Sequence, residues 1–247
     1  MPRSGNAMAT MKSNRDKRAG QAGRPTASEL ERRKARVMEV ATELFISHGY
    51  AGTSLIDIAR GAGVATRTLY QHFGDKEALF REVIFARDAA GAIAKPVVED
   101  GDTLFEALMR AARYALEVTF RPHSIGLMRL MIAESQRFPD FMKQTAMTIF
   151  ARFERNIERV FVTLEKAGAI PSGDHSVSVA IFDDLVQGSR PLMTYTNWRA
   201  GPPSDEELRE RVEFFIRGRF GEAVLATAHT AKIRLAARSE TADSAQG

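Results

Sequence analysis

Apolar residues recur at intervals of three and four positions along most of the chain, which is the spacing of one face of an α-helix. The clearest stripe predicts a helix of residues 29–47, with the apolar positions Val37, Val40, Ala41, Leu44 and Phe45. Gly49 is expected to end this helix. The alternation of apolar and polar residues that is typical of strands is not sustained anywhere in the sequence. We therefore expect an all-α protein.

Three short helices are expected to follow the first. Ser54 and Asp57 form the S-x-x-D pattern of a helix N-terminus, and the glycines up to Gly63 should end that helix. The next helix fits residues 66–72, and Asp75 should cap the one after it.

Five longer helices are expected in the rest of the chain, separated by proline and glycine. Their expected ranges are 102–120, 124–138, 140–168, 175–199 and 204–226. Residues 227–247 are rich in Ala, Ser and Thr and contain no aromatic residue, so we expect a flexible tail there.

Residues 54–73, SLIDIARGAGVATRTLYQHF, have the features of a helix-turn-helix. Ala59 and Ala62 are small enough to let two helices cross closely, and Gly63 supplies a sharp turn between them. The residues expected to anchor the second helix to the core are Val64, Leu69 and Phe73. The opposite face of that helix would then be open to the major groove of DNA.

This open face carries hydrogen-bonding side chains, which are Thr66, Arg67, Thr68, Tyr70, Gln71 and His72. Residues 58–74 contain no Asp or Glu, and a carboxylate there would repel the phosphates of DNA. Each side chain also has a plainer interpretation. Tyr70 and His72 could be half-buried packing residues, and Arg67 could be a solvated charge. Together with Lys76, however, they favour a DNA-binding surface.

Residues 31–91 resemble the TetR family of tetracycline-repressor-like regulators. Five motifs carry the resemblance in order: LF…GY, T-S-x-x-D-I-A, G-A-G-V, T-L-Y-x-H-F and K-E-A-L-F. The resemblance implies a transcriptional repressor that binds a palindromic operator as a homodimer and is released by a small-molecule ligand. Residues 129–141, RLMIAESQRFPDF, resemble the AefR-like subgroup.

The resemblance also implies roles for single residues. Those facing bases or adjacent phosphates would be Thr66, Arg67 and Thr68, and those holding the phosphate backbone would be Tyr70, His72 and Lys76, with Ser54 near a further phosphate. Gln71 occupies a position that varies among family members, so it is a candidate specificity residue. Ala65 stands where many relatives have a serine N-cap, whose loss typically costs about 1 kcal/mol. Thr66 could cap instead, which would shorten the recognition helix.

Charge and composition predict a basic N-terminal arm and a cytoplasmic location. Residues 1–28 contain six Lys and Arg against Asp16 alone, so residues 1–30 are either an arm that assists DNA binding or a solvated start without a role. The absence of cysteine excludes disulfides and Cys-ligated zinc. With no secretory signal and no apolar run of about 18 residues, we expect a cytoplasmic protein that makes no membrane contact.

The remaining chain, residues 92–226, is expected to form a ligand-binding and dimerisation domain, joined to the first near Pro96 and Gly101. Palindromic operators are read by two-fold dimers, and the last two long helices are the candidates for the interface. The expected interface residues are Phe182, Val186, Met193, Leu208, Val212, Phe215 and Ile216. The alternative is that these stripes pack only within one chain.

The sequence indicates the ligand site less clearly than the DNA-binding surface. Residues that could line an apolar cavity are Met109, Tyr114, Met128, Met131, Phe141, Met142 and Phe153, although each could equally be plain core. Arg129 and Glu134 could be a polar anchor in the pocket or an exposed pair.

An enzyme and an architectural DNA-binding protein are the alternatives to a repressor. An enzyme is disfavoured because the five histidines are scattered without metal-ligand spacing. The sequence also contains no G-x-S-x-G elbow, P-loop or G-x-G-x-x-G motif, so we expect neither a cofactor nor a metal. An architectural DNA-bending protein is the second alternative, and it would lack a cavity and show weak sequence preference.

Overall fold

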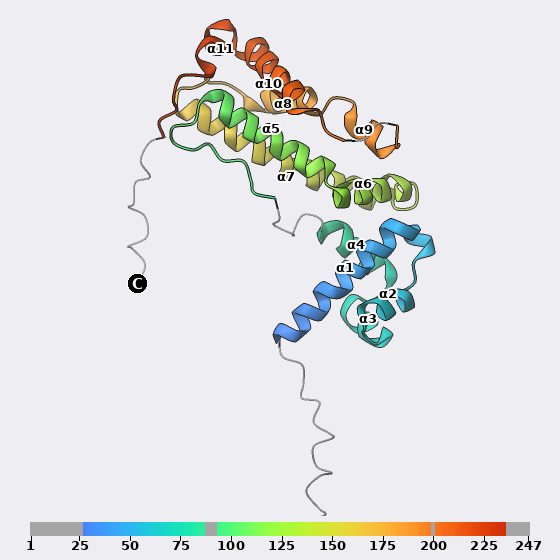
Figure 1. Cartoon of the computed structure of the whole chain (residues 1–247). Coiled ribbons are helices and arrows are strands. Elements are labelled where there is room, and N and C mark those ends of the chain that lie inside the picture. Colours follow the sequence, from blue (N-terminus) through green and yellow to red (C-terminus); the bar gives the residue numbers. More distant parts are fainter. Residues whose placement is uncertain (1–26, 87–92, 199–200, 236–247) are drawn as a thin grey trace, which may run out of the picture.

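The computed structural model describes residues 27–86, 93–198 and 201–235, and within them it contains eleven helices (Figure 1). Extended segments in these ranges meet only at an isolated antiparallel bridge between Thr103 and Lys232. The prediction of an all-α protein is confirmed. Most of the basic arm assigned to residues 1–30 lies outside the described residues, as does the end of the chain beyond residue 235.

The first four helices are short except for the first, as predicted. They are α1 (Ala27–Gly52), α2 (Leu55–Ala62), α3 (Thr66–Phe73) and α4 (Lys76–Ala86). Gly49 has a φ of 72° inside α1, so the regular helix is interrupted at the residue that was expected to end it. Asp75 caps α4, because its Oδ1 accepts from the Ala78 amide at 2.8 Å.

The C-terminal part contains seven helices. They are α5 (Leu104–Phe120), α6 (Pro122–Glu134), α7 (Pro139–Lys166), α8 (His175–Gln187), α9 (Arg190–Tyr195), α10 (Asp205–Phe220) and α11 (Glu222–Ala228). The single helices predicted for residues 175–199 and 204–226 are wrong, because Gly188 and Gly221 divide them. Their φ values of 56° and 91° lie in the region that glycine alone adopts easily.

The structure describes residues 227–235 of the expected tail, and these residues hold a defined place against the loop before α5. The Ile233 amide donates to the Asp102 carbonyl at 2.7 Å, and the Ile233 carbonyl accepts from the Gly101 amide at 2.9 Å. The Ile233 side chain is buried. Gly101, which was expected to bound a joint between domains, therefore holds the C-terminal segment in place.

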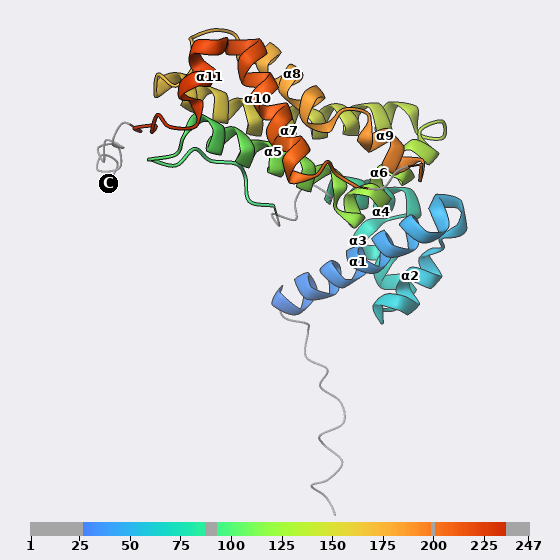
Figure 2. The same ribbon diagram turned by 45° about the horizontal axis from the view of Figure 1, so that its top comes forward.

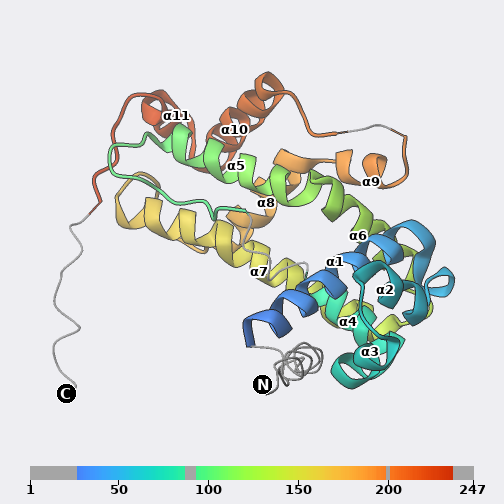
Figure 3. The same ribbon diagram turned by 60° about the horizontal axis from the view of Figure 1, so that its bottom comes forward.

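Buried side chains form two clusters. The N-terminal core consists of residues from α1 to α4 together with Leu127, Leu130, Met131, Phe141 and Met142 of α6 and α7. The C-terminal core consists of buried residues from α5, α7, α8 and α10, with single contributions from loops and from α11. Figures 2 and 3 show α6 and the near end of α7 against α1 and α4. The DNA-binding unit expected at residues 31–91 thus shares its core with α6 and α7.

Asp102 fixes the loop before α5. Its carboxylate accepts from Arg110 at 2.7 and 3.0 Å and from the Glu99 amide at 2.7 Å. Burial raises the pKa of Asp102, but the hydrogen bonds from Arg110 and Glu99 and the charge of Arg110 lower it further, so the net pKa lies below the usual value. The carboxylate side chain is only 10% exposed, while Arg110 is 34% exposed, so part of the attraction is screened by solvent.

We expect Asp102→Asn to lower the free energy of unfolding at pH 7 by about 1.5–3 kcal/mol, the range for hydrogen bonds to charged groups. Because the folded-state pKa is lowered, the wild-type carboxylate stabilises the protein above its unfolded pKa of about 3.9, and this stabilisation is lost as the pH falls through the folded pKa. Urea unfolding of both proteins from pH 7 to pH 3 should show the difference shrinking below about pH 5. A difference in the free energy of unfolding that does not change with pH would contradict this assignment. As a control, Glu31→Gln at an exposed position should change the free energy of unfolding by less than about 0.5 kcal/mol.

Candidate nucleic-acid interface

Helix α3, the expected recognition helix, is held by caps on its neighbour and by two buried side chains. Ser54 caps α2, since its hydroxyl accepts from the Asp57 amide at 3.1 Å and donates to the Asp57 carboxylate at 2.6 Å. Gly63 turns the chain with a φ of 67° and a ψ of 32°. Leu69 and Phe73 of α3 are buried, as predicted, and fix which side of the helix faces inward.

The opposite side of α3 is presented to solvent. Arg67, Gln71 and His72 are exposed, and Tyr70 keeps 57% of its surface. Thr66 and Thr68 are half-buried. Tyr70 and His72 are therefore not packing residues in this chain, and the structure brings all six expected side chains of α3 onto the accessible part of one short helix.

Helix α3 begins without a side-chain cap, as expected from the alanine at position 65. Ala65 occupies the N-cap position and makes no side-chain capping bond, while its carbonyl accepts from the Thr68 amide at 2.8 Å. Thr66 is the first helical residue and not the cap, so the alternative of a shortened recognition helix is wrong. The amides at the beginning of α3 consequently lack the cap that a serine would supply.

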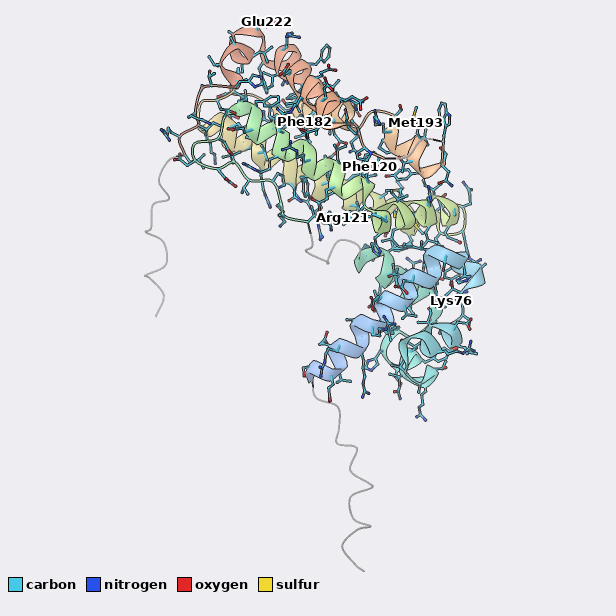
Figure 4. All side chains as sticks on the ribbon, in the orientation of Figure 1. Lys76, Phe120, Arg121, Phe182, Met193 and Glu222 are labelled. Carbon is cyan, nitrogen blue, oxygen red and sulfur yellow. The ribbon has the colours of Figure 1, made fainter. Side chains whose placement is uncertain are left out.

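Lys76 and Ser54 are engaged inside the protein. The Lys76 ammonium donates to the Thr53 carbonyl at 2.8 Å and lies 4.3 Å from the centre of the Tyr50 ring. Burial, followed by the positive charge of Arg137, lowers the pKa of Lys76. Figure 4 shows Lys76 beside the end of α1. Both residues thus brace the start of α2. The S-x-x-D pattern predicted this position for Ser54, but nothing in the sequence indicated it for Lys76.

The close approach of α1 and α2 depends on Gly61, which the sequence marked only as part of a helix end. A Cβ added at Gly61 would lie 2.7 Å from Cγ1 of Val40. Val40 is buried and β-branched, so its methyl group has little room to move away.

We expect Gly61→Ala to lower the free energy of unfolding by about 1–2 kcal/mol, because the overpacking exceeds the gain in helix propensity. In a Val40→Ala background the same change should be neutral or stabilising. A double-mutant cycle by chemical denaturation measures this coupling. Equal destabilisation in both backgrounds would show that Val40 is not the obstacle.

A polar and aromatic contact joins the two parts of the chain. Glu134 of α6 accepts from the Tyr50 amide at 3.1 Å, and the Arg137 guanidinium lies 4.7 Å from the centre of the Tyr50 ring. Phe138 meets the same ring edge-on at 5.0 Å. Arg129, by contrast, donates to the Thr194 carbonyl of α9 at 2.7 Å. Glu134 and Arg129 are therefore neither a pocket anchor nor an exposed pair, because each ties α6 to another element.

The expected ligand-pocket residues divide between the two cores. Met109, Tyr114 and Phe153 belong to the C-terminal core. Met131, Phe141 and Met142 belong to the N-terminal core, while Met128 is half-buried. Met131, Phe141 and Met142 therefore pack against helices α1 to α4, and not with the three residues in the core of the bundle.

Polar groups lie inside the C-terminal bundle that the sequence did not indicate. Asn156 donates to the Tyr114 hydroxyl at 2.7 Å, and the Tyr114 and Phe153 rings stack at 6.0 Å. On α8, burial raises the pKa of Asp183, against a smaller lowering by a hydrogen bond from Gln187. Asn156 and Asp183 lie on different helices, so no regular spacing along the sequence pointed to them.

The expected dimer-interface residues are mostly internal. Buried in the C-terminal core of a single chain are Phe182, Val186, Leu208, Val212, Phe215 and Ile216, with Met193 half-buried on α9. Figure 4 labels Phe182 within the bundle. The predicted interface is wrong for these six residues, because the apolar stripe on each helix faces its own chain. On α8 and α10 the large apolar side chains that are exposed are instead Val177, Ile181 and Phe214.

Comparison with known proteins decides the family. Residues 37–83 match the model for bacterial regulatory proteins of the tetR family, and residues 106–217 match the C-terminal domain of AefR-like transcriptional repressors. The chain belongs to the TetR family. TetR proteins are transcriptional regulators, so this TetR-family chain is a regulator and not an enzyme.

Relatives of this TetR-family protein include the transcriptional regulator SrpR of Pseudomonas putida. It is 25% identical over 166 residues, which cover 67% of this chain and 76% of SrpR. AcrR of Shigella flexneri is 40% identical over 60 residues, which cover 24% of this chain and 28% of AcrR. The second similarity therefore concerns a much smaller part of both chains.

Solved TetR structures share the fold over most of the chain. A regulator from Mesorhizobium loti superposes with a TM-score of 0.64 at 25% identity, covering 78% of this chain and 98% of that one. The flavonoid-responsive regulator FrrA gives 0.62 at 27% identity, covering 76% and 97%. Within the described ranges, none of the helices has both the length and the apolar character to span a membrane.

Proposed function

We propose that this TetR-family regulator is a sequence-specific repressor that binds a palindromic operator as a homodimer and leaves it when a small molecule binds. Residues 31–91 would form the DNA-binding unit, residues 92–226 the ligand-binding and dimerisation unit, and residues 1–30 an arm that assists DNA binding. The observation that carries the proposal is the exposed face of α3, which presents Arg67 and Tyr70 to solvent and contains no carboxylate.

The roles on this face follow from reach and chemistry. Arg67 is exposed in the first turn of α3 and would donate to a guanine, with Thr66 and Thr68 beside it. Tyr70 and His72 would donate to phosphates and so support binding to any sequence. Gln71 would contribute to specificity. Ser54 and Lys76 would act mainly by fixing the start of α2 and α4 next to the phosphate backbone.

A two-fold dimer would present α3 twice, and we propose the outer faces of α8 and α10 as its interface. These two helices lie side by side on the part of the bundle farthest from α3 (Figure 1). Ile181 is 41% exposed and Phe214 is 60% exposed in the single chain. Exposed apolar side chains on two neighbouring helices are what a surface covered by a partner would carry.

The ligand would bind inside the C-terminal bundle near Tyr114, Phe153 and Asn156. The stacked rings supply an apolar wall, while the amide and hydroxyl supply hydrogen bonds that orient a ligand. Since FrrA is described as flavonoid-responsive and is 27% identical to this chain, planar polyphenols are the first class to test. Movement of α6 would reach the DNA-binding unit through the contact between Glu134 and Tyr50.

The test is a titration of duplex DNA with the purified protein, using inverted repeats from the DNA flanking its gene. The proposal predicts binding to one repeat at least about a thousandfold tighter than to scrambled duplex. It also predicts that one compound of a polyphenol panel weakens this binding by about fivefold or more. Equal affinity for repeat and scrambled DNA would favour the architectural alternative, and a panel without effect would count against ligand release.

A further inference from the structure

We propose that the cleft between α1, α4 and α6 is a second ligand site, which binds a small amphipathic cation. The cleft has a volume of about 580 Å³, and it is lined by Met38, Glu39, Thr42, Glu43, Ile46, Val83, Pro122 and His123. This volume falls within the range of about 300–1,000 Å³ that is usual for small-molecule sites. None of these residues belongs to the ligand site proposed above.

The cleft owes its shape to the spacing of residues on α1. Glu39, Thr42, Glu43 and Ile46 are three, four and seven positions apart, so they lie on one face of the helix. Val83 of α4 and Pro122 of α6 supply the apolar walls from the other two helices. The lining therefore combines an apolar interior with two carboxylates from one side.

The negative charges of the lining residues favour a cationic ligand. Glu39 and Glu43 are the only acids among the lining residues, and no Lys or Arg lines the cleft. Arg36 pairs with Glu39 at 2.6 Å, whereas Glu43 makes no ion pair with any residue that the structure describes. A cation with an apolar body would place its charge at Glu43 and bury its body against Met38, Ile46 and Pro122. An anion of the same shape would meet only repulsion from these carboxylates.

The cleft touches both parts of the protein. Ile46 packs against Gly126 of α6 so closely that a Cβ at Gly126 would lie 2.8 Å from Cγ2 of Ile46. Ile46 therefore forms both a wall of the cleft and the contact between α1 and α6. A ligand in the cleft would be linked to the relative placement of the DNA-binding unit and the bundle.

The experiment uses the full chain without DNA, so that its outcome does not depend on the repressor proposal. The methionines are labelled with 13C in the methyl group, the Met38 signal is assigned with Met38→Leu, and benzyltrimethylammonium is titrated in. We expect a saturable shift of the Met38 methyl signal, and no saturable shift with phenylacetate, which has a similar ring but the opposite charge.

Glu43→Gln should weaken binding of benzyltrimethylammonium by about three- to tenfold, because a partly shielded ion pair is lost. The matched control is Glu158→Gln, which removes an exposed carboxylate from α7, outside the cleft lining, and should leave the affinity unchanged. The proposal is overturned if the Met38 signal does not respond, if shifts arise only at methionines of the bundle, if phenylacetate binds equally well, or if Glu43→Gln binds like the wild type.

Discussion

Replacing Arg67 by alanine is expected to weaken binding to the operator by about 5- to 150-fold, because a bidentate contact with guanine contributes about 1–3 kcal/mol of discrimination. Arg67 is exposed and supports no packing, so the variant should keep the stability of the wild type. Fluorescence anisotropy with labelled operator and with scrambled duplex measures both affinities. Binding to scrambled duplex should change by less than about threefold, since phosphate contacts from Tyr70 and His72 remain.

The matched control for Arg67→Ala is Arg155→Ala, which removes the same charge from an exposed position on α7. Its effect should be small on both DNAs at physiological salt, because a charge far from the DNA is screened. If the two variants lose the same affinity for the operator, Arg67 acts through net charge alone and reads no base.

The double substitution Ile181→Glu and Phe214→Glu is expected to raise the dissociation constant of the dimer by at least about a hundredfold. It would bury four carboxylates in the two-fold interface, and unpaired buried charges are costly. Both side chains are exposed in the single chain, so the monomer should stay folded. Light scattering should shift from a mass near twice 27.3 kDa to a mass near 27.3 kDa, and operator binding should be lost at the same protein concentration.

A control for this dissociation replaces two exposed apolar residues elsewhere, Met147→Glu and Phe150→Glu on α7. This variant should remain a dimer and still bind the operator. If the α7 variant dissociates and the α8–α10 variant does not, the dimer interface has been assigned to the wrong face. Thermal unfolding of both variants, followed by circular dichroism, separates dissociation from loss of the fold.

The sequence predicted the helices of the DNA-binding unit well because each boundary there has local chemistry. Ser54, Gly63 and Asp75 act on the backbone within a few residues, and the structure shows each of them at a helix end. In the C-terminal part, Gly188 and Gly221 break helices that the apolar pattern treated as continuous. A single glycine inside a periodic pattern is tolerated in many helices, so the break depends on tertiary contacts that the pattern does not contain.

The sequence did not allow us to predict what each side chain packs against or binds. An apolar stripe such as that of Phe215 and Ile216 predicts that one face of a helix is buried. The pattern does not tell whether that face packs against helices of the same chain or against a second copy of the chain. Likewise, the partners of Lys76 and Glu134 are the Thr53 carbonyl and the Tyr50 amide, which are backbone groups 23 and 84 positions away. Backbone groups leave no trace in the residue types of the sequence, so these contacts could not be predicted.

In the proposed dimer, the exposed face of α3 reads a base sequence twice in a two-fold arrangement. Selection from a pool of randomised duplexes by the wild type and by Arg67→Ala, followed by sequencing, shows whether it does. We expect the wild type to enrich one inverted repeat and the variant to lose preference at one position in each half of that repeat. Enrichment of no common sequence by the wild type, or of the same repeat with the same preferences by both proteins, would contradict it.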